Sequence, residues 1–162
     1  MTKITFTLFL GAFLTLTAAA QQPVVEAGQP EELKGVTRIH VSAFNKEARN
    51  NIIAEIKKRL PQVTITDRSE EAEVWLLFSV ARRDFPKTNP MVELGGTRTS
   101  GTPVMEYEMV ASGTIIKPVS KERGRRLIEF KETAPTITPF TGLALSTKFA
   151  RAFVKSYRKA NS

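Results

Sequence analysis

The stretch VTRIHVSAFNKEARNNIIAEIKKRLPQVTITDRSEEAEVWLLFSV, residues 36–80, decides the fold because it encodes a strand, a helix and two further strands in succession. Residues 36–44 alternate in polarity, with Ile39, Val41 and Ala43 on one side and polar residues on the other. This period of two is typical of a half-buried strand. The segment therefore begins with a strand that faces a core on one side.

A helix follows this strand and ends at a proline. Asn45 offers a side-chain oxygen as an N-cap, and Pro61 cannot continue a helix. Apolar residues between them recur at helical spacing, while charged residues occupy the other positions. The apolar positions are Ala48, Ile52, Ile53, Ile56 and Leu60.

Two strands complete the stretch. Residues 63–66 alternate between apolar residues and threonine, and residues 67–73 form a polar turn rich in acids. Residues 74–80, VWLLFSV, are almost continuously apolar, which predicts a central strand buried on both faces.

The second half of the chain predicts a long loop, a hairpin and a closing helix. Residues 84–103 contain three prolines and three glycines and read as the loop. Residues 104–116 and 126–131 alternate in polarity on either side of the turn at 120–124, and we expect a helix from Ser146 to Lys159.

These elements predict an α+β fold with the order β-α-β-β-(long loop)-β-β-α. We expect a two-layer structure, in which a mixed sheet of four to five strands carries both helices on one face. The opposite face is then exposed, in agreement with the polar Glu106 and Glu108. Residues 36–162 form this single domain, and residues 21–35 read as a flexible leader.

Residues 1–20 have the three-part layout of a secretory signal peptide. Lys3 precedes an apolar run from Ile4 to Leu16, and small residues at Ala18 and Ala20 suit signal peptidase. The alternative is a retained membrane anchor, but the apolar run is shorter than the about 20 residues that span a bilayer. We therefore expect a protein of the periplasm or a secreted protein, cleaved near Ala20.

The chain contains no cysteine, which excludes disulfides, thiolate metal sites, thiol nucleophiles and a lipidated cysteine anchor. An exported domain without disulfides fits a bacterial periplasm. The net charge of +8 is concentrated near the C-terminus, because residues 117–162 hold eleven Lys and Arg against three Asp and Glu. Such an asymmetry favours an anionic partner, although solvated charges that aid solubility are an alternative.

The basic residues lie in the predicted hairpin and the closing helix. In that helix Phe149, Phe153 and Tyr157 recur every four residues, which is typical of a stripe packed against a core. The remaining positions are basic and suit contact with an anionic surface. The candidate contact residues are Arg123, Arg125, Arg126, Arg151, Lys155 and Arg158.

No catalytic or metal-binding constellation stands out. His40 is the single histidine and has no neighbouring ligands, so we interpret it as structural. The acidic stretch 67–73 lacks the ligand alternation of a calcium loop. Ser156–Lys159 matches a serine–lysine tetrad by letter, but its partner motifs are missing. We expect a protein that is not an enzyme and has no cofactor or metal.

The succession IHVSAF, a helix ending KKRLP, VTITD and EEAEVWLLFSV resembles exported bacterial envelope domains. It is similar to the amino-terminal domain of the TolB periplasmic protein and to the related domain of curli-secretion and transport-auxiliary lipoproteins. Glu71-Ala72-Glu73-Val74 matches their acidic turn into a central strand, and the hairpin and closing helix follow in the same order. The resemblance covers about residues 36–160 and implies non-enzymatic work in envelope assembly or protein interaction.

Two functions follow as hypotheses. The first is a non-catalytic binding or assembly module that uses the exposed sheet face or the loop 84–103 against an envelope protein. The second is a basic binder of anionic lipid or envelope polymer through the hairpin and closing helix. An outward-facing sheet edge can also pair with a second copy of the chain. Nucleic acid is not expected, because no aromatic residues interleave with the basic hairpin.

Overall fold

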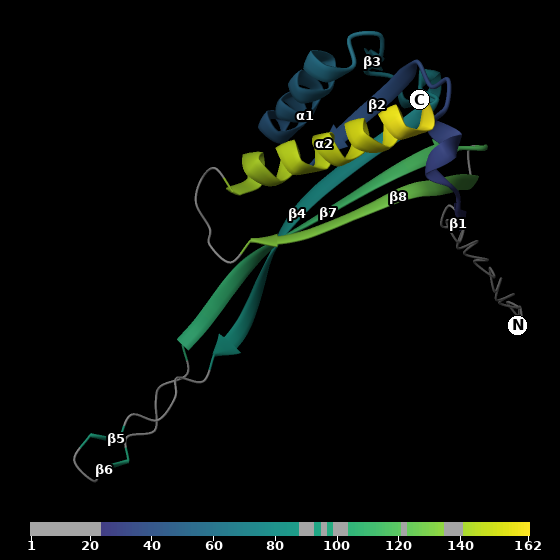
Figure 1. Cartoon of the computed structure of the whole chain (residues 1–162). Helices are drawn as coiled ribbons and strands as arrows, with labels where there is room; N and C mark the ends of the chain where they lie inside the picture. Colours follow the sequence, from purple (N-terminus) through teal and green to yellow (C-terminus); the bar gives the residue numbers. More distant parts are fainter. Residues whose placement is uncertain (1–23, 88–92, 95–96, 99–103, 121–122, 135–140) are drawn as a thin grey trace, which may run out of the picture.

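A six-stranded mixed sheet with two helices on one of its faces makes up the fold (Figure 1). The computed structural model describes residues 24–87, 93–94, 97–98, 104–120, 123–134 and 141–162. The strands of the main sheet are β1 (Val24–Ala27), β2 (Arg38–Ala43), β3 (Thr64–Thr66), β4 (Val74–Lys87), β7 (Val104–Pro118) and β8 (Arg123–Ala134). The helices are η1 (Pro30–Leu33), α1 (Lys46–Arg59), η2 (Ser69–Glu71) and α2 (Thr141–Ala160).

The strand order is β1-β8-β7-β4-β2-β3. The long strands β4, β7 and β8 pair antiparallel, whereas β2 pairs in parallel with both β3 and β4. This confirms the predicted α+β class and the placement of both helices on one face. The predicted strand count of four to five is wrong, because β1 adds a sixth strand parallel to β8.

The segment predicted as a flexible leader, residues 21–35, contributes to the fold from Val24 onward. Leu33 is fully buried, and its carbonyl accepts a hydrogen bond from Asn161 Nδ2 at 3.2 Å. Nearby, the Tyr157 hydroxyl donates to the carbonyl of Val36 at 2.8 Å. Strand β1 was not predicted, because all four of its residues are exposed and it joins the sheet edge through its backbone. Residues 1–23, including the predicted signal segment, lie outside the described residues.

The predicted loop 84–103 begins inside a strand. Residues 84–87 belong to β4 and pair with residues 104–107 of β7. Two short strands, β5 (Glu93–Leu94) and β6 (Thr97–Arg98), pair antiparallel within the same segment. The remaining residues of the predicted loop lie outside the described residues.

Both predicted long helices are present. The Asn45 side chain accepts a hydrogen bond from the backbone nitrogen of Ala48 at 2.7 Å, which confirms the predicted N-cap. The α1 helix ends at Arg59, before Pro61, and α2 begins five residues earlier than predicted. Asn51 Nδ2 of α1 donates to the Leu143 carbonyl of α2 at 3.0 Å and so ties the helices together.

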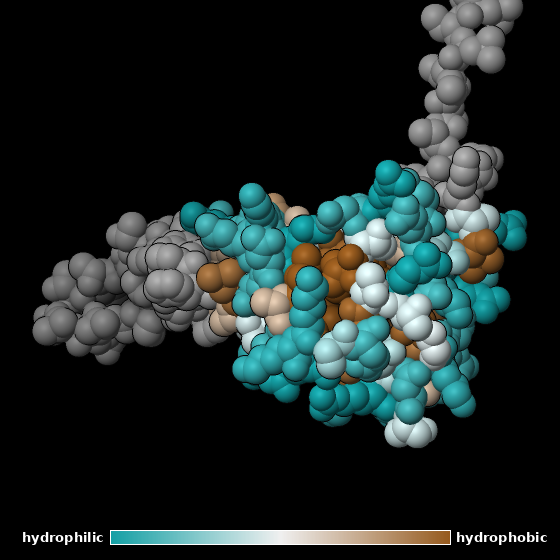
Figure 2. Space-filling view, turned by 90° about the horizontal axis from the view of Figure 1, so that it is seen from above, coloured by the Kyte–Doolittle hydropathy of each residue, from teal (hydrophilic) through white to brown (hydrophobic). Residues whose placement is uncertain are grey.

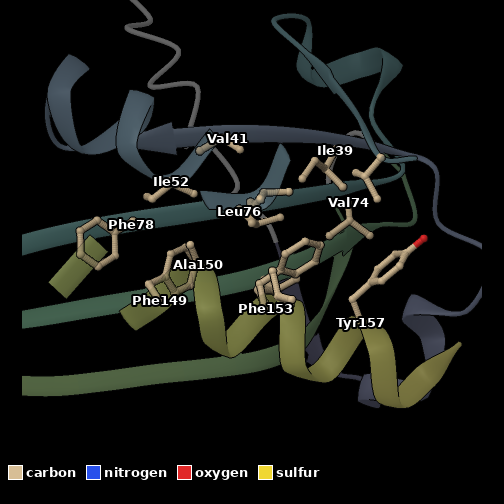
Figure 3. Close-up of a cluster of buried hydrophobic side chains, with 14 of the residues drawn as sticks. Ile39, Val41, Ile52, Val74, Leu76, Phe78, Phe149, Ala150, Phe153 and Tyr157 are labelled. Atoms are coloured by element: carbon tan, nitrogen blue, oxygen red, sulfur yellow. The ribbon is translucent and has the colours of Figure 1, made fainter. Parts of the chain in front are cut away.

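The core lies between the helices and the sheet (Figure 3). Phe149 of α2 is fully buried in it, and its ring stacks on Phe78 at a centroid distance of 5.2 Å and contacts Phe130 at 5.6 Å. Gly113 of β7 lies directly beneath, since a Cβ atom there would come within 2.4 Å of the Phe149 ring. The predicted aromatic stripe of α2 is therefore packed against the core, with Phe149, Phe153 and Tyr157 all buried.

Seen from the helix side, hydrophilic residues frame an apolar area over the middle of the molecule (Figure 2). None of the helices within the described residues is long and apolar enough to cross a membrane.

Candidate functional site

The sheet face opposite the helices is open, because both α1 and α2 lie on the other face (Figure 1). In the strand register, His40, Trp75, Ile116 and Arg126 are neighbours in one row across four strands. Ser42, Leu77, Thr114 and Glu129 form the next row. The rows mix apolar and polar side chains that are half-buried or exposed. The aromatic Trp75 and the arginine Arg126 in the first row are of the residue types that are enriched in protein interfaces.

Strand β4 is buried on one face only, contrary to the prediction from its apolar run. Val74, Leu76 and Phe78 are buried beneath the helices, whereas Leu77 keeps 36% of its surface exposed. Trp75 is half-buried on the open face. The described residues supply no second layer that would cover this face, so the apolar side chains Trp75 and Leu77 remain available for contact.

A shallow pocket lies beside Trp75 at the end of the sheet where β4 begins and β7 ends. Its volume is about 420 Å³, and its walls combine the indole and Pro118 with the polar Ser69, Glu70 and Ser120. Trp75 Nε1 donates to the Ser69 carbonyl at 2.7 Å, so η2 holds the ring in place. Apolar walls with a few polar groups are typical of small binding pockets.

The single histidine also lies on the open face, where it has a structural contact. His40 Nδ1 is 3.1 Å from the carbonyl oxygen of Thr66 in the neighbouring strand. Among the described residues, no group of three or more His, Asp and Glu side chains is arranged to hold a metal ion.

Most of the acidic stretch 67–73 stabilises the local fold. Glu73 Oε2 accepts hydrogen bonds from the backbone nitrogens of Thr37 at 2.6 Å and Arg38 at 2.9 Å. These bonds, that of Arg38 first, hold the pKa of Glu73 below its ordinary value. Asp67 pairs with Arg49, and Glu71 pairs with Arg68.

Three of the predicted basic residues meet at the seam between the two long helices, which we call the seam pocket. Arg151, Lys155 and Arg158 of α2 line it together with Arg59 of α1 and the apolar Val154. Its volume is about 250 Å³. Arg59 was not among the predicted contact residues, because only the packing of α1 on α2 brings it to this place. The basic end of α1, Lys57 to Arg59, was the available signal.

Glu55 connects two cations of the seam pocket. Its Oε1 accepts from Arg59 Nε at 2.7 Å and from Arg151 Nε at 3.0 Å, and the Glu55 side chain is 14% exposed. These bonds, that of Arg151 first and then that of Arg59, lower the pKa of Glu55. Glu55 is therefore charged at neutral pH and fixes both guanidinium groups.

The hairpin arginines have other partners. Arg125 Nη1 is 3.3 Å from Glu32 Oε2, and Arg126 Nη1 is 3.3 Å from Glu129 Oε2. Neighbours in a strand point to opposite faces, so Arg125 and Arg126 lie on different sides of the sheet. Arg123 is exposed at the start of β8. The structure thus brings together the helix members of the predicted basic set but does not add the hairpin members to the seam pocket.

The tetrad Ser156–Lys159 lies in the last turns of α2, with Tyr157 buried in the core.

No protein-family model matches this chain, and no curated protein is similar to it. The resemblance to the TolB amino-terminal domain and the envelope lipoproteins therefore stays a prediction from the order of the elements.

Proposed function

We propose that this protein is an exported, non-catalytic binding or assembly module of the cell envelope, which docks a protein partner on the open face of its sheet. The observation that carries the proposal is the uncovered face itself, where Trp75 and Leu77 are accessible beside polar neighbours. The signal-like residues 1–20 support export.

The chemistry of this face suits a protein partner. Tryptophan is enriched among the residues that dominate binding energy in protein interfaces. Trp75 is the only tryptophan of the chain, and its hydrogen bond to Ser69 fixes the ring before any partner arrives. Because less side-chain freedom is then lost on binding, the affinity gains from this order.

The proposal is tested by capturing partners from the periplasm of a cell that exports the tagged protein. We expect a defined protein to copurify and crosslink with the wild type, and to be lost with Leu77→Glu, which places a charge in the middle of the open face. Ala54→Glu, on the exposed side of α1, is the matched control and retains the partner. Equal capture by both variants would place the binding elsewhere.

A second candidate function is the binding of anionic lipid or envelope polymer through the basic residues near the C-terminus. The observation that favours it is the seam pocket, where four cationic side chains meet around one cavity. Cosedimentation with anionic vesicles tests this function. We expect binding at low ionic strength that disappears near 0.5 M salt, where the Debye length falls below about 5 Å.

A further inference from the structure

The seam pocket contains more hydrogen-bond donors than the fold uses. Arg59 and Arg151 each donate through Nε to Glu55, and their Nη atoms make no hydrogen bond to the described residues. An arginine side chain has five N–H donors in a planar fork, so four donors of each fork remain. Both side chains line the cavity.

The other two cations add to this surplus. Arg158 uses Nη2 to donate to the carbonyl of Arg59 at 3.1 Å. Lys155 is exposed and has no hydrogen bond or ion pair with any described residue. The three N–H donors of the Lys155 ammonium and the remaining N–H donors of the Arg158 guanidinium are thus free to bind a ligand.

The charges around the cavity are unbalanced. Four cations line or border it, and Glu55 is the one carboxylate bonded to them among the described residues. The local surplus is therefore three positive charges. A phosphate monoester carries about −1.5 to −2 at pH 7 and has several acceptor oxygens, which matches this surplus better than a single carboxylate does.

The geometry is partly fixed in advance. The bonds to Glu55 hold Arg59 and Arg151 from two different helices, so a ligand does not have to order both side chains by itself. The cavity of about 250 Å³ is smaller than the about 300 to 1,000 Å³ of drug-sized pockets, which suits one charged group rather than a whole organic ligand.

We infer that the seam pocket is a binding site for a phosphate group, which is carried either by a lipid headgroup or by a free phosphate ester. The inference rests on the second candidate function and names the chemical group that it recognises. Arg59 and Arg151 supply paired N–H donors to the phosphate oxygens, and Lys155 supplies a point charge at the open side. The open sheet face takes no part in this site.

The test is a titration of the folded protein with inorganic phosphate, followed by NMR at about 0.15 M ionic strength, with acetate at the same ionic strength as the comparison anion. We expect phosphate to shift the resonances of Arg59, Arg151 and Lys155 saturably, and acetate to shift them far less. Lys155→Gln is expected to weaken phosphate binding about tenfold, the usual effect of losing a charge-assisted hydrogen bond.

Lys159→Gln is the matched control. It removes the same charge one turn further along α2, from an exposed side chain that does not line the pocket. We expect it to change the affinity less than about twofold, since exposed charges without contact contribute little at this salt. Equal weakening by the two variants, equal shifts with acetate, or no phosphate binding would overturn the inference.

A second experiment, with lipid vesicles, distinguishes the two sources of phosphate. It also tests the phosphate site and the second candidate function separately. Vesicles of phosphatidic acid, whose headgroup is a phosphate monoester, in phosphatidylcholine are compared with phosphatidylcholine alone, whose phosphate is a diester. Vesicle binding that is sensitive to Lys155→Gln supports a lipid headgroup in the seam pocket. Phosphate binding without vesicle binding supports a free phosphate ester and contradicts the binding of anionic lipid. Vesicle binding that Lys155→Gln leaves unchanged supports the second candidate function and contradicts a phosphate site in the seam pocket.

Discussion

The two faces of one sheet differ in what their side chains contact. On the covered face, residues of β2, β4 and β7 are buried beneath α1 and α2, where Phe149 packs on the sheet (Figure 3). On the open face, the alternate residues of the same strands stay half-exposed or exposed. Stability and the proposed function therefore depend on opposite sides of the same strands.

The largest effect is expected from the covered face. Phe149→Ala removes the ring that stacks on Phe78 and contacts Phe130, and leaves a cavity above Gly113. We expect a loss of about 3 to 5 kcal/mol in the free energy of unfolding, measured by denaturant titration. A loss below about 1 kcal/mol would mean that the helix does not cover the sheet as described.

An intermediate effect is expected where the sheet end is tied to the preceding loop. Glu73→Gln keeps the shape of the side chain but removes the charge that accepts from Thr37 and Arg38. We expect a loss of about 1 to 2 kcal/mol, as for other hydrogen bonds to a charged group.

The same carboxylate predicts a pH dependence. Its pKa in the folded state is lower than the ordinary value of 4.5, so its contribution to stability is fully present above that pH. The contribution is lost as the pH falls through the lowered pKa of the folded state. The free energy of unfolding, measured at a series of pH values from neutral to acidic, should therefore fall less in Glu73→Gln than in the wild type. Parallel declines would show that this group does not contribute.

The smallest effect on stability is expected on the open face. Leu77→Thr replaces a partly exposed residue by one that also favours strands. We expect the free energy of unfolding to change by less than about 1 kcal/mol, measured as for Phe149→Ala. A loss as large as that of the core variant would contradict the difference between the faces.

The sequence predicted where the helices and strands lie better than it predicted what each of them packs against. Alternation and helical spacing located β2, α1, β3 and α2, because burial against one layer leaves a periodic pattern. The prediction that β4 is buried on both faces was wrong, because a continuous apolar run is also compatible with a strand whose second face is exposed. Strand β1 was missed because its pairing uses the backbone, which leaves no pattern in the side chains.

The candidate site was predictable only in part. The basic character of α2 was evident from Arg151, Lys155 and Arg158 in the sequence. Arg59 and Glu55 were not associated with them, because the contact between α1 and α2 joins residues far apart in the chain. The open face could be expected from the number of helices, but which residues of β4 lie on it required the strand register.

The docking of a protein partner on the open face is tested most directly by photocrosslinking in living cells. A photoreactive residue is placed at Leu77 or Ser79 on the open face, and at Ala54 or Lys58 on the exposed side of α1. We predict that the open-face positions crosslink to one defined envelope protein and that the α1 positions do not. Crosslinks to that protein from α1 alone, or none from the open face, would contradict it.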